Sequence, residues 1–302
     1  SARIRKPVLI MHDTLAFWGR LIAETIGVKA VSINTIITAY EYNSRSFRMY
    51  MKQFALPSVK EIREIPNILK YRCMVKRKYN LKRMDVLGIL MNKEKFNVFT
   101  YPKVMHPDRK TIGKGNYFIG PSSIFREENC NYIPDKLNGV TKDRKIIYVS
   151  LGTIFNKSIH FYGNIFKAFG NTGYRVVISC GGQYDKLLRM NIPSNIELFP
   201  YVDQREIFRK AILFITAGGM NSICEAAASG VPCLLCPQQG EQRINAERFE
   251  RLGLGRLLKD GERICNEAEE LIADFKPEER KVEVFSKVYI EELIKKLQNY
   301  IR

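Results

Sequence analysis

The stretch FITAGGMNSICEAAASGVP (214–232) contains the features of a buried strand, a glycine turn and a helix. Apolar residues come first, as in a strand of a parallel sheet covered on both faces, and Gly218 and Gly219 then open a turn. Asn221 and Ser222 follow at the start of the helix, where backbone N–H groups lack intrahelical partners and attract anions. The stretch therefore predicts a phosphate site. The simpler alternative is a tight turn followed by a helix that Asn or Ser caps.

Two other turns, SLGT (150–153) and SCGG (179–182), also follow apolar runs and precede helical patterns. Three such turns at strand ends favour the phosphate site over the alternative, because backbone amides at glycine turns can approach a ligand closely. No GxGxxG motif with an acidic residue about twenty positions later is present, so a dinucleotide oxidoreductase is not supported. A diphosphate fits amides without a metal, so we expect no cofactor.

Strands and helices alternate along the chain, first over 7–34 and again from KIIYVSLGT (145–153) to a helix at 241–252. This alternation predicts an α/β protein with two Rossmann-like, doubly wound domains and ligands at the carboxyl ends of the strands. The polar segment 126–145 is the best candidate for a linker, since Pro134 and Gly139 interrupt regular structure. We predict an acceptor-side domain at 1–138, a second domain at 139–282, and a helix at 283–302 that packs back across the domains.

The charge of the chain is strongly positive, with 49 Lys and Arg against 31 Asp and Glu and a formal net charge of +18. This balance suits a polyanionic partner. The run 60–85 carries nine basic residues and three acidic ones, which indicates either a solvated helix face or contact with an anionic membrane. Nucleic acid is not expected as a partner, because no recognisable reader motif accompanies the charge.

The apolar runs and the cysteines indicate a cytoplasmic protein. If the run 60–85 contacts an anionic membrane, the protein is also peripheral at that membrane. No run approaches the ~20 apolar residues of a membrane span, and the first residues lack the apolar core of a secretory signal. Seven cysteines without disulfide-like spacing favour a reducing compartment. Cys233 and Cys236 form a CxxC inside an apolar run, which predicts packed thiols rather than a metal or redox site.

Polar residues near the predicted phosphate site are candidates for contacts with a sugar. Glu225 lies one turn along the helix that opens at Asn221, where a carboxylate can accept hydrogen bonds from a ribose. Glu241 and Gln242, in PQQGEQ (237–242), follow the next strand and suit a polyhydroxylated ligand. The alternative for both carboxylates is a favourable interaction with a helix N-terminus.

From about Lys145 to Leu258 the chain resembles the nucleotide-sugar domain of the UDP-glycosyltransferases, especially the bacterial macrolide-type branch. The stretch FPYVDQREIFRKAILFITAGGMNSICEAAASGVPCLLCPQQGEQRINAERFERLGLGRLL (199–258) carries the resemblance. It implies a glycosyltransferase-B fold of two Rossmann-like domains. By this match Tyr201 stacks on uracil, Val202 offers its backbone to the base, and Gln204 and Glu225 contact the ribose. The diphosphate would be surrounded by Thr153, Ala217, Gly218, Gly219, Asn221 and Ser222, and the sugar hydroxyls would meet Glu241 and Gln242.

The segment MHDTLAFWGRLIAETIGVKAVSIN (11–34) resembles the family segment whose aspartate orients a catalytic histidine, and that aspartate is Asp13. The resemblance implies that the histidine takes a proton from an acceptor hydroxyl, which attacks the anomeric carbon and inverts it. The predicted function is metal-independent transfer of a sugar from a UDP-sugar to a small-molecule or lipid-like acceptor. The helix amides after Gly219 would stabilise the leaving diphosphate.

Two departures from the family pattern oppose this interpretation. His12, His106 and His160 do not fall at the place of the catalytic histidine, and Asp13 lies so near the first residue that we expect an incomplete first domain. Ala217 stands where the family has a histidine that donates to the diphosphate. The alternative function is therefore a catalytically degenerate homologue that binds a nucleotide or a protein partner without glycosyl transfer.

Overall fold

The computed structural model describes residues 7–37, 59–81, 93–106, 112–121, 145–152, 158–279, 282–285 and 289–302. The chain forms two compact units, one made of Ser1–Gly120 with Lys287–Arg302 and the other of Pro121–Ser286. The predicted boundary between 138 and 139 lies outside the described residues. No helix within the described ranges is long and apolar enough to cross a bilayer.

A parallel four-stranded sheet in the order β1-β2-β3-β4 organises the first unit. Helix α1 (Phe17–Ile26) connects the first two strands and ends at Gly27, whose φ of 68° supplies the predicted left-handed C-cap. Its strands are β1 (Leu9–Asp13), β2 (Lys29–Asn34), β3 (Asn97–Phe99) and β4 (Asn116–Phe118).

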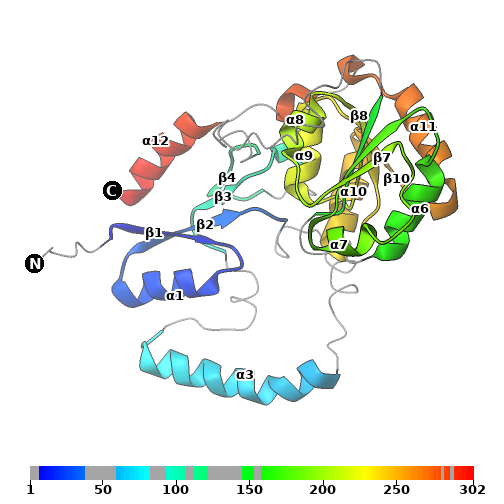
Figure 1. Ribbon diagram of the computed structural model, residues 1–302. Coiled ribbons are helices and arrows are strands. Elements are labelled where there is room, and N and C mark those ends of the chain that lie inside the picture. Colours follow the sequence, from blue (N-terminus) through cyan, green and yellow to red (C-terminus); the bar gives the residue numbers. More distant parts are fainter. Residues whose placement is uncertain are drawn as a thin grey trace, which may run out of the picture. The chain divides into compact units, whose positions relative to one another are not determined.

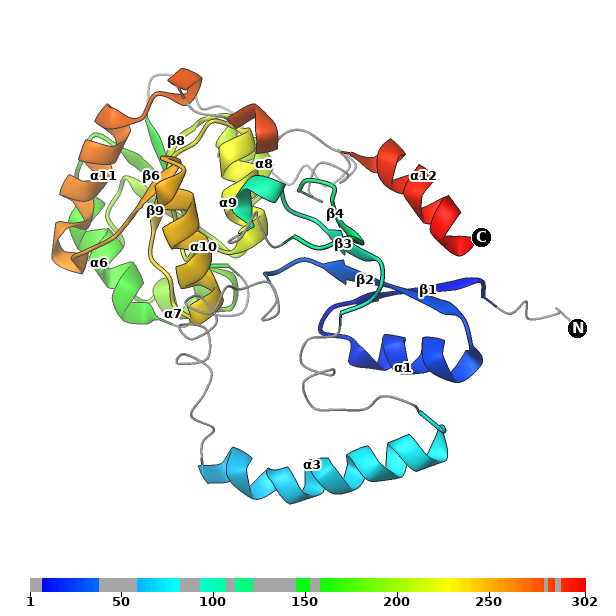
Figure 2. The same ribbon diagram turned by 180° about the vertical axis from the view of Figure 1, so that it is seen from behind.

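The last helix, α12 (Ile290–Ile301), belongs to the first unit and covers one face of its sheet, whereas α1 covers the other (Figures 1 and 2). Leu293, Leu297 and Tyr300 of α12 pack on a cluster of buried strand and loop residues that includes Val31 and Phe96. Lys29 Nζ also donates to the Tyr300 carbonyl oxygen at 2.5 Å. The predicted helix over 283–302 thus begins at Ile290, after a short 3-10 turn at Val282–Phe285.

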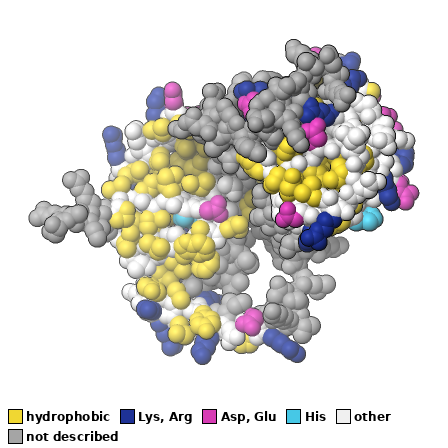
Figure 3. All heavy atoms as spheres, viewed as in Figure 1, with side chains coloured by type: hydrophobic (Ala, Val, Ile, Leu, Met, Phe, Trp, Pro, Cys, Tyr) yellow, Lys and Arg dark blue, Asp and Glu magenta, His cyan; other side chains and the backbone are white. Residues whose placement is uncertain are grey.

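Apolar side chains gather on the surface of the first unit, over the sheet and α1 (Figure 3). Among the strands that the structure describes, β1 lies at the edge of the sheet and pairs with β2 alone. The exposed large apolar side chains on or next to β1 and α1 are Val8, Met11, Leu15, Trp18 and Ile22.

Helix α3 (Val59–Lys78) falls in the basic run and contains Pro66. Its described apolar side chains are largely exposed, with Tyr71 at 63% and Met74 at 54%. Three consecutive basic residues, Lys76, Arg77 and Lys78, occupy its last turn, where they complement the negative end of the helix dipole.

The second unit contains a parallel six-stranded sheet in the order β10-β9-β8-β5-β6-β7. The chain starts at the central strand β5, moves outward through β6 and β7, and then returns to β8 on the other side of β5. The strand order therefore reverses between β5 and β8, which is where doubly wound folds bind ligands. The strands are β5 (Ile146–Ser150), β6 (Arg175–Ser179), β7 (Ile196–Phe199), β8 (Ala211–Thr216), β9 (Cys233–Leu235) and β10 (Gly255–Leu257).

Helices lie on both faces of this sheet, with α6 and α11 on one face and α8 and α9 on the other (Figures 1 and 2). Both faces of β5 are buried, as in other parallel sheets between two helix layers. The helices are α6 (Ile159–Phe169), α7 (Tyr184–Leu187), α8 (Gln204–Phe208), α9 (Met220–Ala228), α10 (Gly240–Arg251) and α11 (Ile264–Asp274).

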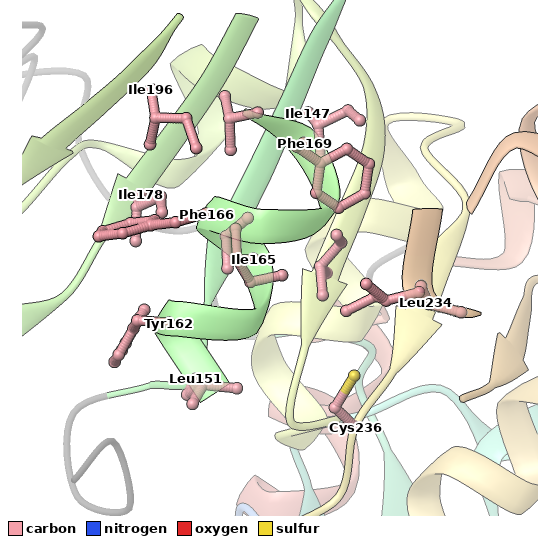
Figure 4. Close-up of a cluster of buried hydrophobic side chains, with 14 of the residues drawn as sticks. Ile147, Leu151, Tyr162, Ile165, Phe166, Phe169, Ile178, Ile196, Leu234 and Cys236 are labelled. Atoms are coloured by element: carbon pink, nitrogen blue, oxygen red, sulfur yellow. The ribbon is translucent and has the colours of Figure 1, made fainter. Parts of the chain in front are cut away.

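The main core of the second unit lies between the sheet and α6. Figure 4 shows Tyr162, Ile165 and Phe166 of α6 among strand residues such as Ile147 and Leu234. These side chains are 6% exposed or less, so their burial supplies the hydrophobic stabilisation of the unit, about 25 cal/mol for each Å² of apolar surface removed from water. A rigid sheet packed in this way holds the strand ends at fixed positions.

The alternation of strands and helices predicted from the sequence is confirmed, and the α/β class with Rossmann-like sheets is correct. Two elements were missed, β10 and α11. The strand β10 has only three residues, one of them glycine, and α11 follows it without a strong capping signal.

Candidate functional site

Two adjacent strands end in the same way at the carboxyl edge of the second sheet. Ser150 and Thr216 are register partners at the ends of β5 and β8. Two residues later each strand is followed by a glycine with positive φ, 86° at Gly152 and 88° at Gly218. Each glycine N–H donates back to the hydroxyl oxygen at 3.4 Å. The two turns thus lie side by side where the strand order reverses.

Helix α9 begins directly after the second turn. Its N-cap, Gly219, is extended and makes no side-chain cap bond, and the first intrahelical bond is donated by the Ile223 N–H to Gly219. The amides before Ile223 therefore remain available at the positive end of the helix. Asn221 and Ser222 are in the first turn of α9, where Asn221 is exposed and Ser222 is half-buried. The N-cap residue is Gly219, so neither of these side chains caps the helix.

A short hydrogen bond joins two of the predicted ribose-contacting residues. Gln204 Nε2, in the first turn of α8, donates to Glu225 Oε2 of α9 at 2.5 Å. Both side chains are half-buried. The predicted base-binding residues precede them after β7, where Tyr201 is 49% exposed and Val202 is 1% exposed. An exposed aromatic ring beside a buried backbone segment can stack on a planar ligand.

Asp203 has a structural role. It is 4% exposed and is the N-cap of α8, where its Oδ1 accepts a hydrogen bond from the Arg205 N–H at 3.0 Å. This capping bond explains how the short helix begins.

Glu241 and Gln242 lie in the first turn of α10. Burial raises the pKa of Glu241, and a hydrogen bond from Asn245 opposes that shift. Gln242 is 7% exposed, and its Oε1 accepts from the Gln238 N–H at 2.8 Å. Gln238 in turn donates through Nε2 to the Cys236 carbonyl at 2.8 Å, which braces the loop between β9 and α10.

Ala217 is 1% exposed and belongs to the hydrophobic core cluster. Leu151, its counterpart in the neighbouring turn after β5, is 2% exposed and lies in the same cluster. The side chain of residue 217 therefore starts inside the core, and an imidazole there would have to displace packed atoms to reach an anion.

A buried tyrosine lies behind the site. Tyr148 of β5 is 2% exposed and stacks on Phe214 with ring centroids 5.1 Å apart. Burial raises the pKa of Tyr148, while hydrogen bonds with the side chains of Ser150 and Ser179 oppose the shift. The phenol therefore stays protonated. Tyr148, Gln238 and Asn245 were not identified from the sequence. Only the position of Gln238 within PQQGEQ (237–242) could have pointed to one of them.

In the first unit Asp13 is the last residue of β1, and its Oδ1 accepts from the Leu15 N–H at 2.7 Å. The neighbouring His12 is 5% exposed, and its Nε2 lies 3.4 Å from Glu94 Oε1. His106 is also buried, against the rings of Phe99 and Phe118. Thr153, predicted at the diphosphate, lies outside the described residues.

The CxxC cysteines are packed thiols, as predicted. Cys233 and Cys236 are both free and buried. Burial raises the pKa of Cys236 to about 12 and that of Cys233 well above its ordinary value, so neither is a thiolate at neutral pH. Within the described residues, no group of three or more His, Cys, Asp or Glu side chains could hold a metal ion.

Comparisons with known proteins identify similar sequences. The model of the glycosyltransferase family 28 C-terminal domain matches residues 155–293. The NDP-glycosyltransferase YjiC of Bacillus licheniformis is 33% identical over 84% of this chain and 60% of its own length. YjiC of Bacillus subtilis is 32% identical over 88% of this chain and 64% of its own length. The oleandomycin glycosyltransferase of Streptomyces antibioticus is 27% identical over 83% of this chain.

Solved structures show the fold. The glycosyltransferase of kitacinnamycin superposes with a TM-score of 0.75 at 23% identity, covering 94% of this chain and 72% of that one. The calicheamicin glycosyltransferase CalG4 gives 0.70 at 26% identity, covering 93% and 70%. The predicted glycosyltransferase-B fold class is confirmed. The chain spans about 60% of the length of its curated YjiC relatives. It belongs to the UDP-glycosyltransferase family.

Proposed function

We propose that the protein binds a UDP-sugar in its second unit and transfers the sugar to a hydroxyl group of a small-molecule or lipid-like acceptor. The observation that carries the proposal is the paired turns at β5 and β8, with the N-terminus of α9 beside them. Backbone amides at a helix N-terminus bind phosphate oxygens. The Gln204–Glu225 pair one turn away is suited to a ribose.

The choice of donor and acceptor draws on the relatives. Two of them are named NDP-glycosyltransferases and another a UDP-glucosyltransferase, which supports a nucleoside-diphosphate sugar as donor. The relative named for oleandomycin supports a small-molecule acceptor. In this proposal Glu241 and Gln242 contact the sugar hydroxyls, and Tyr201 stacks on the uracil.

The proposed chemistry is a direct displacement with inversion at the anomeric carbon. By the family resemblance, an acceptor hydroxyl loses its proton to an imidazole base that Asp13 orients, and the oxygen attacks as the bond to the diphosphate breaks. None of His12, His106 and His160 stands at the matching position for that base. Negative charge then develops on the leaving diphosphate. The free amides at the start of α9 stabilise that charge without requiring a metal ion. Ala217 supplies no hydrogen-bond donor, which is expected to lower phosphate affinity by about 1.5–3 kcal/mol relative to a histidine donor.

The test is a transfer assay with UDP-glucose and a panel of hydroxylated small molecules, with UDP release and glycosylated product measured together. Product with inverted anomeric configuration, formed equally well in excess chelator, is the expected result. Saturable UDP binding without any transfer would instead identify the alternative, a homologue that binds a nucleotide and does not turn it over. No UDP binding at millimolar concentration would contradict both, and would leave only a homologue that binds a protein partner.

For location, we propose a cytoplasmic protein that makes peripheral contact with anionic membranes through the run 60–85. The free thiols among the described cysteines are compatible with a reducing compartment. Leu69, Tyr71 and Met74 of α3 are exposed, and Lys70 and Arg72 lie between them in the sequence. Figure 3 shows apolar and basic side chains close together on the surface of this helix. Apolar side chains that insert and cations that meet anionic headgroups are the two requirements of an interfacial helix.

Vesicle co-sedimentation tests this contact. The native chain should bind vesicles containing phosphatidylglycerol, and added salt should release it. Reversal of three charges in the last turn, K76E/R77E/K78E, should weaken binding about 100-fold, at about 1 kcal/mol for each charge removed from the surface. UDP binding is the control for folding. Equal binding to neutral phosphatidylcholine vesicles would refute the electrostatic contact.

A further inference from the structure

One buried asparagine connects the two halves of the candidate donor site. Asn245 lies on α10, one turn after Glu241, and is 0% exposed. Its Nδ2 lies 3.2 Å from the Gly218 carbonyl oxygen and 3.3 Å from Glu241 Oε1. An amide nitrogen carries two hydrogens, so it can donate to both acceptors at once. The turn after β8 and the first turn of α10 are thereby tied to the same side chain.

The first hydrogen bond fixes the orientation of a peptide group that faces the candidate phosphate site. In a trans peptide the carbonyl of one residue and the N–H of the next point in opposite directions. Because Asn245 holds the Gly218 carbonyl, the Gly219 N–H is directed away from α10's buried face. That N–H belongs to the N-cap of α9, where unpaired amides are available to an anion.

The second hydrogen bond acts on the charge of Glu241. Burial raises the pKa of this carboxyl, which favours the neutral acid, and the bond from Asn245 lowers it again. A charged carboxylate accepts hydrogen bonds from sugar hydroxyls, and a neutral acid accepts fewer. The bond from Asn245 therefore keeps Glu241 in the state that binds a sugar and also fixes its rotamer.

The amide oxygen of Asn245 indicates that the residue does more than fill space in the core. Asn245 Oδ1 is buried and makes no hydrogen bond within the described part of the chain. An unpaired buried acceptor destabilises a fold, whereas an apolar side chain of similar size would fill the same space without that cost. The contribution of the residue lies in the two bonds that its nitrogen donates.

We propose that Asn245 is a positioning residue that orients the Gly218–Gly219 peptide toward the diphosphate and the Glu241 carboxylate toward the donor sugar. The proposal rests on the proposed function, because it assigns these two groups to parts of a UDP-sugar. It goes further in making one residue responsible for both parts of the donor site.

The experiment measures the affinities of the 302-residue chain for UDP and UDP-glucose at a series of pH values from neutral to acid, because a carboxyl with a raised pKa takes up its proton above the ordinary range. The variants are N245A, the nearly isosteric N245D, E241Q and the double variant E241Q/N245A. The matched control is Asn195→Ala. Asn195 also holds backbone through its amide, with Nδ2 2.8 Å from the Phe169 carbonyl, but it precedes β7 at the opposite end of the strands.

For N245A we expect UDP affinity to fall about fivefold, the effect of one ordinary hydrogen bond. The additional affinity for UDP-glucose over UDP should disappear at a higher pH than in the native chain, because Glu241 loses the bond that lowers its pKa. E241Q should remove this pH dependence. In the double variant E241Q/N245A, the affinity for UDP should fall, and the difference between UDP-glucose and UDP should stay as it is in E241Q alone. N245D should be weaker still, since a buried carboxylate would repel both acceptors. N195A should lower the melting temperature and leave both affinities unchanged.

Several results would overturn the proposal. If N245A and N245D change neither UDP affinity nor the pH dependence, as expected of N195A, the residue is structural only. If N245A lowers the affinity for UDP-glucose equally in the native chain and in E241Q, the role toward Glu241 is contradicted. The same holds if the native chain binds UDP-glucose no more tightly than UDP. Absence of UDP binding by the native chain would instead sink the proposed function itself, and this inference with it.

Discussion

The turn after β8 makes a sharp prediction, because its two glycines differ in what a methyl group would meet. At Gly218 φ is 88°, and an added Cβ would lie 3.2 Å from the Gln242 carbonyl oxygen and 3.7 Å from the Ala246 Cβ. At Gly219 φ is −61°, and an added Cβ would meet no atom within 4 Å. Alanine should therefore be strained at position 218 and tolerated at position 219.

The expected size follows from two costs and one gain. A positive φ costs a non-glycine residue about 1–2 kcal/mol, and the tight contact with a backbone oxygen adds about 1 kcal/mol. Alanine also restricts the unfolded chain, which returns about 0.4–1 kcal/mol. Gly218→Ala should then lower the free energy of unfolding by about 1–2.5 kcal/mol. For a unit of this size that corresponds to a melting temperature about 2–10 °C lower.

Thermal unfolding of the G218A and G219A variants, followed by circular dichroism, measures the difference. We also expect G218A to weaken UDP binding, because the contact with Gln242 pushes the turn away from the first turn of α10. G219A is the matched control for stability, since it adds the same methyl group to the neighbouring residue. If G218A melts with the native protein, or no lower than G219A, the description of this turn is wrong.

Three further predictions concern the candidate site. Glu225→Ala should weaken UDP binding about 10-fold or more, the loss of a charge-assisted hydrogen bond, and should abolish any preference for UDP over 2′-deoxy-UDP in calorimetric titrations; a preserved preference would show that Glu225 does not contact the ribose. Ala217→His should strengthen UDP binding by a similar factor while lowering the melting temperature, because the side chain at this position starts in the core; unchanged affinity would mean that the diphosphate is held differently. Glu241→Gln should raise the melting temperature at pH 7 and have little effect near pH 3, because a carboxyl whose pKa is raised by burial destabilises the folded state only when it is charged; an equal effect at both values would contradict that cause.

Most strands and helices of the second unit were predictable because these strands are short apolar runs that end at a glycine or a polar turn. IIYVS and AILFIT are wholly or largely buried, as their composition indicates. The strand GRL of β10 carries no such pattern, and its position is set by pairing with β9. Local sequence cannot reveal a strand that only its neighbour stabilises.

The candidate site was predictable where residue type alone carries the chemistry. Glycines, Asn221 and Ser222 at a helix start, and Glu225 one turn later, were identified from spacing. Asn245 was missed because an asparagine in a helix is common, and only the fold brings it to Gly218, twenty-seven residues earlier. The burial of Ala217 and the capping role of Asp203 likewise depend on packing and backbone conformation.

The central claim is that the carboxyl edge of the second sheet binds a uridine diphosphate. Isothermal titration of the chain with UDP, alongside Tyr201→Ala and Glu225→Ala, tests it most directly. The account predicts saturable binding of one UDP per chain that both substitutions weaken while the melting temperature stays within a few degrees of the native value. Absence of saturable binding at millimolar UDP, or binding that neither substitution changes, would contradict it.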